Sequence, residues 1–73
     1  MPVDERIVEP GKHFAAAGQV REVLEVLTEA AATGDEMRQV RRVSYRERGH
    51  RKETWADLSA FAREVEKEVP GDQ

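Results

Sequence analysis

The sequence has 73 residues, 38% of them hydrophobic, no cysteine, and a formal net charge of −3. So short a chain forms one small domain with a thin core, the missing cysteines exclude a disulfide scaffold and thiolate metal sites, and no apolar run has the roughly 18–20 residues of a membrane span. We therefore expect a single cytoplasmic domain over residues 1–73, with flexible ends at 1–12 and 70–73, and a homodimer or a bound partner that adds to its stability.

The first apolar residues, Ile7 and Val8, favour a short strand or an ordered arm that ends at Pro10-Gly11. A long amphipathic helix is predicted next, over about residues 13–33, because apolar side chains recur there every three or four residues. Gly34 suits the left-handed position just past the end of a helix. The apolar stripe of this helix consists of Val20, Val23, Leu24, Leu27, Ala30 and Ala31.

Positive charge is concentrated in residues 38–52, which we call the basic segment. It carries seven cations against Glu47 alone, a local charge of +6, whereas residues 1–37 carry −5 and residues 53–73 carry −4. Cations this close together repel unless acidic groups of the fold or of a partner relieve them. Two readings follow: ion pairs with the acidic flanks, or a surface that binds an acidic macromolecule.

The conformation of the basic segment is less clear from its pattern. Val43, Ser44 and Tyr45 alternate with the period of a strand. Gly49-His50 has the glycine-first order of a two-residue hairpin turn. We expect a basic strand or hairpin over about 38–53, with a helix as the alternative.

A second helix is predicted over about 54–69. Thr54 and Asp57 resemble a capping box at its start, and Pro70-Gly71 ends it. The expected fold is therefore α+β, with two amphipathic helices packed against the central basic strand or hairpin. If the basic segment is helical, the chain is instead an all-α three-helix domain.

The sequence offers little support for catalysis or for a bound cofactor. His13 and His50 are the only imidazoles, 37 positions apart, and no cysteine accompanies them, so the three or four ligands of a zinc site are missing. Ser44 and Ser59 have no base beside them in the sequence. We expect no enzyme activity, no cofactor and no metal.

The charge distribution predicts a small regulatory or adaptor protein whose basic segment binds an acidic macromolecule, either an acidic protein surface or a nucleic acid. Arginine dominates the segment, and its planar group binds phosphate and carboxylate bidentately. A protein partner is favoured over a nucleic acid because the chain as a whole is acidic. The expected binding residues are Arg38, Arg41, Arg42, Arg46, Arg48, His50, Arg51 and Lys52.

An alternative is a protein-binding inhibitor or antitoxin-like module, which docks through an amphipathic helix or an exposed strand. Val26 lies off the main apolar stripe, and Tyr45 lies inside the basic segment, so both are candidate partner contacts. Neither function involves a membrane.

Overall fold

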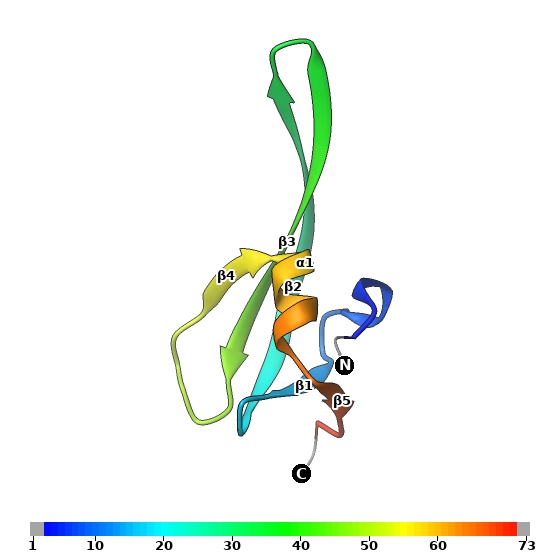
Figure 1. Cartoon of the computed structure of the whole chain (residues 1–73). Helices are drawn as coiled ribbons and strands as arrows, with labels where there is room; N and C mark the ends of the chain where they lie inside the picture. The colour runs from blue at the N-terminus through cyan, green and yellow to red at the C-terminus, as the bar shows by residue number, and fades with distance from the viewer. Residues whose placement is uncertain (1–2, 72–73) are drawn as a thin grey trace.

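The computed structural model describes residues 3–71, apart from the side chains of Ala31 and Thr33, so the predicted flexibility of residues 1–2 and 72–73 lies outside the described part. The described residues form a five-stranded antiparallel sheet in the order β4-β3-β2-β1-β5, with one short α-helix (Figure 1). The elements are η1 (Glu5–Ile7, a 3₁₀ turn), β1 (His13–Ala16), β2 (Gln19–Thr33), β3 (Glu36–Glu47), β4 (Thr54–Asp57), α1 (Leu58–Glu64) and β5 (Lys67–Val69).

The predicted fold of two amphipathic helices around a basic strand is wrong, and so is the all-α alternative. Residues 13–33 form β1 and β2 instead of a helix. A β-bulge at Leu24, between the pairs Val23↔Tyr45 and Glu25↔Ser44, explains the error. Because a bulge adds one residue to a strand, Val23 and Val26 are three positions apart yet lie on the same face, which imitates the spacing of a helix.

Two tight turns replace the other expected helical features. Ala17 and Gly18 join β1 to β2, and both have positive φ, at 50° and 81°, as a type I′ hairpin turn requires. Gly34, expected to follow a helix end, has φ of 63° and opens the two-residue turn between β2 and β3. A positive φ suits glycine in either setting, so the residue alone does not distinguish them.

The predicted helix over 54–69 is also wrong at both ends. Residues 54–57 form β4, which pairs with β3 through Ser44↔Trp55 and Val43↔Ala56. The helix α1 begins only at Leu58, and Asp57 precedes it without a side-chain capping hydrogen bond. Val65 returns to extended backbone, with φ −82° and ψ 152°, and β5 then pairs with β1.

The basic segment contributes most of β3 and the connection that follows it. Extended backbone begins at Glu36 and ends at Glu47, and the connection to β4 spans residues 48–53. The last pair between β3 and β4 is Tyr45↔Thr54, so the eight residues 46–53 close this hairpin, and not a two-residue turn at Gly49-His50. Gly49 lies within this loop with φ of 86°.

The core lies between one face of the sheet and α1. Phe61 of α1 is fully buried and meets Phe14 edge to face, with ring centroids 5.9 Å apart, and Tyr45 at 5.1 Å. The nine residues of the core cluster are Val8, Phe14, Ala16, Val23, Val43, Tyr45, Leu58, Phe61 and Val65. We call this side of the sheet the covered face and the opposite side the open face.

β2 and β3 extend well beyond the other strands. Their pairing continues from Leu27↔Arg42 to Thr33↔Glu36. Arg42 still pairs with Asp57 of β4, but beyond it neither strand has a further neighbour in the sheet among residues 3–71. We call this part, residues 27–42, the ribbon; it projects from the body of the molecule (Figure 1). The ribbon gives the protein principal extents of 47 × 27 × 18 Å.

Candidate macromolecule-binding surface

The alternation of β3 decides where each arginine of the strand lies. Val43 and Tyr45 are buried against α1, so odd-numbered residues of β3 lie on the covered face and even-numbered ones on the open face. Arg38, Arg42 and Arg46 therefore share the open face. The strand geometry thus distributes the predicted binding residues over both sides of the sheet.

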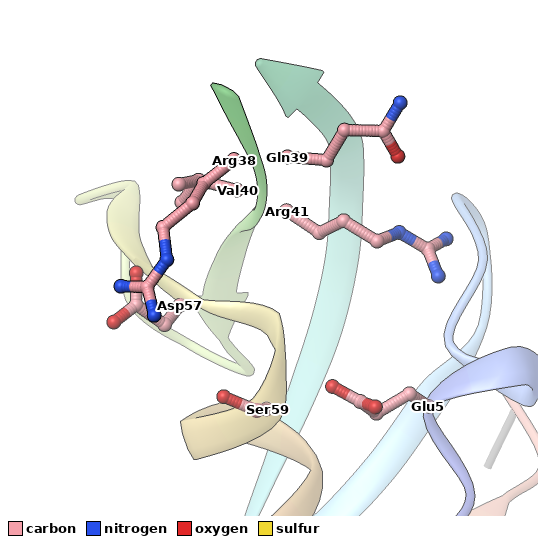
Figure 2. A pocket seen from close by; sticks show the side chains of 7 residues that line it. All are labelled: Glu5, Arg38, Gln39, Val40, Arg41, Asp57 and Ser59. Carbon is pink, nitrogen blue, oxygen red and sulfur yellow. The ribbon is translucent and has the colours of Figure 1, made fainter. Parts of the chain in front are cut away.

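Two arginines of the ribbon, Arg38 and Arg41, lie where the ribbon leaves the body of the molecule. Figure 2 shows Arg38 directed to the side of Asp57, and Arg41 directed to the side of Glu5. Both arginines line a hollow of about 460 Å³ between the ribbon and the first turn of α1. Because two carboxylates also line this hollow, it is electrostatically mixed and is no dedicated anion site.

Arg46 is the one cation of the basic segment that forms an ion pair with an acidic residue among residues 3–71. Its Nη2 atom donates a hydrogen bond to Glu22 Oε1 at 2.9 Å. The other carboxylate oxygen of Glu22 lies 3.8 Å from His13 Nε2. The first reading of the charge pattern, neutralisation within the fold, therefore applies to Arg46.

The loop after β3 carries the second group of predicted binding residues. Arg48, His50, Arg51 and Lys52 are all exposed. Arg48 donates a hydrogen bond of 3.5 Å to the carbonyl oxygen of Gly71, and His50 Nδ1 lies 3.5 Å from a carboxylate oxygen of Glu47. We call Arg48, Arg51 and Lys52 the loop group, and Arg38, Arg41 and Arg42 the ribbon group.

These two groups have in common that they lack carboxylate partners. Within residues 3–71, no Asp or Glu oxygen lies within 4.0 Å of a side-chain nitrogen of either group. All six side chains are exposed to solvent. Most of the basic segment is therefore left with charges that the described part of the fold does not neutralise.

The two candidate partner contacts lie on the covered face. Tyr45 is only 8% exposed, and its ring stacks with the guanidinium of Arg21 at 4.7 Å. Val26 is half-buried and packs against the core. A partner that approaches the molecule from outside meets little of either side chain.

Two apolar residues of the open face are not among the predicted binding residues. Trp55 and Leu27 remain 38% and 36% exposed, and together with Glu29 and Arg42 they line a hollow of about 240 Å³. The capping box at Thr54 favours a helix, in which Trp55 begins an apolar stripe directed to the core. The alternation of residues 54–57 instead indicates a strand in which Trp55 lies on the face away from the core. A pattern of four residues is, however, a weaker signal than a capping box.

The hydroxyls and imidazoles do not converge on a reactive arrangement in the described part of the chain. Ser44 is fully buried, and its Oγ atom has no hydrogen-bond partner. Among residues 3–71, no three His, Asp or Glu side chains are grouped as a metal ion needs. In the same part of the chain, no helix has the length and apolar character to cross a membrane.

Comparison with known proteins adds no assignment: no family model matches the chain, and neither the search of curated proteins nor that of solved structures gave a significant match. We therefore infer the function from the geometry and the charges of the molecule.

Proposed function

We propose that the protein is a small non-enzymatic regulator or adaptor that binds an acidic protein surface through its basic segment. The observation that carries this proposal is the absence of carboxylate partners around the ribbon and loop groups in residues 3–71. Six exposed cations that lack carboxylate partners in the described part of the chain repel one another. An acidic partner that lies against them relieves this repulsion and forms charge-assisted hydrogen bonds.

The loop group is proposed as the main contact. The ribbon group lies among carboxylates: Asp57 is directly opposite Arg42 in the sheet, and Glu5 lines the same hollow as Arg41. The loop group has three cations within five residues, at the end of the molecule away from the ribbon tip (Figure 1). A partner meets the densest positive charge there.

A protein is favoured over a nucleic acid as the partner because of the charges around the basic segment. The whole chain carries −3, and Asp35 and Glu36 stand at the tip of the ribbon. A ribbon that enters a DNA groove would bring these acids close to phosphates, whose negative charge dominates such binding. A protein surface of mixed charge has no such conflict.

The alternative function, docking through a helix or an exposed strand, now relies on strands. α1 has seven residues, and its apolar side chains Leu58, Phe61 and Ala62 are buried in the body. Beyond Arg42, by contrast, the outer edges of β2 and β3 in the ribbon have no neighbouring strand among residues 3–71. Such edges accept an added strand in many complexes.

Fluorescence anisotropy with two labelled probes, a poly-glutamate peptide and a DNA duplex, tests the proposal at low salt. We expect the wild-type chain to bind the peptide, and the triple variant Arg48→Glu, Arg51→Glu, Lys52→Glu to bind it at least about tenfold more weakly. The matched control is Arg63→Glu with Lys67→Glu, since both residues are exposed cations outside the basic segment.

The two probes separate the partner classes. Tighter binding to DNA, with an affinity that falls steeply as salt rises, would assign the surface to nucleic acid. If the wild type binds neither probe, or the control variant loses as much affinity as the triple variant, the proposal is wrong.

A further inference from the structure

The open face of the sheet carries two charged rows side by side. Arg38, Arg42 and Arg46 recur every four residues along β3 on this face. Three acids of the neighbouring strand β2 lie on the same face. Residues directly opposite each other in an antiparallel pair share a face, and each of these acids is opposite an even-numbered residue of β3. These acids are Glu22, Glu25 and Glu29, opposite Arg46, Ser44 and Val40.

Within the part of the chain that the structure describes, no helix covers these rows. α1 packs on the other side of the sheet through Phe61. Between the charges, the open face also presents Leu27, Val40 and Trp55, and two of these are more than a third exposed. Tryptophan and arginine are enriched in protein interfaces.

The molecule has more surface than a compact chain of its size. Its accessible surface is 5340 Å², whereas a compact monomer of 8.3 kDa has about 4,600 Å². The radius of gyration, 13.1 Å, likewise exceeds the value of about 11 Å for a compact domain of 73 residues. The surplus area is close to the roughly 800 Å² that each partner buries in a standard interface.

We propose that a second copy of this chain docks on the open face, with a two-fold axis parallel to the strands between β2 and β3. This rotation places β3 of each copy over β2 of the other copy. The cationic row of each copy then faces the acidic row of its partner. A face that carries one row of each sign is complementary to itself, which is the condition for a closed two-fold dimer.

The same axis keeps the strands of both copies in one direction. Both ribbons therefore extend to one end of the dimer, and both loop groups lie at the other end. The ribbons, which as isolated two-stranded hairpins would be only marginally stable in water, cover each other's open side. Dimer formation does not depend on the proposed function, but it would present two loop groups to one acidic partner and raise its avidity.

Sedimentation equilibrium tests the dimer with charge-exchanged variants. The first variant, Arg38→Glu with Arg42→Glu, has acidic rows on both strands. The second, Glu25→Arg with Glu29→Arg, has basic rows on both strands. We expect the wild type to have twice its monomer mass of 8.3 kDa at about 100 µM. Each variant alone should be monomeric, and an equimolar mixture of the two should form the dimer again, because both contacts are then complementary.

A control variant and a second measurement keep the test decisive. Arg41→Glu with Arg63→Glu changes two exposed charges outside the open-face rows and should leave the dimer intact. Trp55, the only tryptophan, should show a blue shift of its fluorescence as the wild-type concentration rises. This readout needs no variant to fold.

Three results would overturn the inference: a wild type that stays monomeric and shows no shift, a mixture that fails to dimerise although both variants are folded by circular dichroism, or a control variant that dissociates. The loop-group triple variant should remain dimeric. Failure of the acidic-partner proposal is therefore distinguishable from failure of the dimer.

Discussion

Three aromatic rings from three distant parts of the sequence meet at one residue, Phe61. It is fully buried and contacts Phe14 of β1 and Tyr45 of β3. Because the core cluster has only nine members, few other side chains compensate for the loss of this ring. Phe61 thus holds α1 against the sheet.

Replacing Phe61 with Ala should cost about 3–5 kcal/mol, the usual penalty for an aromatic side chain removed from a core. Since small domains have a total stability of about 5–15 kcal/mol, urea denaturation should show a much lower midpoint or no cooperative transition. The matched exposed position is Ile7, 40% exposed. Equal losses for Ile7→Ala and Phe61→Ala would contradict the assigned core.

Gly71 lies against the ring of His13, where a side chain does not fit. A Cβ atom at position 71 would approach Cε1 of that ring to 2.6 Å. Gly71→Ala should therefore displace the imidazole, weaken the end of β5 and cost about 1 kcal/mol. Urea denaturation of the double variant with His13→Ala should show a smaller cost for Gly71→Ala than in the wild type. An unchanged cost would mean that the contact is unimportant.

Arg6 holds the pKa of Asp4 at about 2, below its usual value of 3.8, mainly through its side-chain hydrogen bonds and then through its backbone N–H. A lowered pKa stabilises the fold at pH above 3.8, and this contribution disappears as the pH falls towards 2. In Arg6→Ala, an NMR titration should give Asp4 a pKa between these values, since the backbone donor at position 6 remains. Arg51→Ala is the control. A pKa still near 2 in Arg6→Ala would contradict the assigned cause.

At the residue scale, the sequence allowed part of the surface to be predicted. Arginine is almost always charged and seldom buried alone, so the exposure of the ribbon and loop groups follows from composition. Arg21 is the exception: its side chain is 16% exposed and lies over the ring of Tyr45. That position depends on β2, β3 and α1 meeting, which no local pattern indicates.

The turn between β1 and β2 holds a residue other than glycine at positive φ. Ala17 has φ of 50°, a conformation that costs an L-residue with a Cβ about 1–2 kcal/mol. Gly18 follows it, so Ala17→Asn creates Asn-Gly, the pair preferred in type I′ turns.

Ala17→Asn should therefore raise the free energy of unfolding by about 0.5–1 kcal/mol in urea denaturation. Ala17→Val provides the contrast, because a β-branched side chain resists positive φ and should lower stability. If both variants are destabilised, this turn is not the type I′ turn described here.

At the element scale, prediction failed where two signals point the same way for different reasons. Alanine, leucine and glutamate favour helices, and residues 19–33 are rich in them. The bulge at Leu24 adds the three-residue spacing that strengthens the same reading. Pairing with β3 from Arg21 to Thr33 outweighs local preference, because strand stability comes from neighbours rather than from the isolated segment.

For the whole molecule, the sequence indicated a small single chain with an uneven charge, but not its topology. The sheet joins β1 to β5, which are more than fifty residues apart in the sequence. Such a contact leaves no periodic trace in either segment. The open face likewise leaves no periodic trace in the sequence, because it is defined only by the packing of α1 on the other side of the sheet.

The pairing of β2 with β3 is regular from Glu25↔Ser44 to the tip, and this makes the reach of the ribbon an adjustable length. Successive residues alternate between faces, so removing two consecutive pairs from its middle would shorten the arm by about 6.7 Å and leave every remaining side chain on its own side. Removing a single pair would turn the outer part over. Lengthening or trimming this arm in even steps is therefore the change that evolution or an engineer can make at least risk to the body.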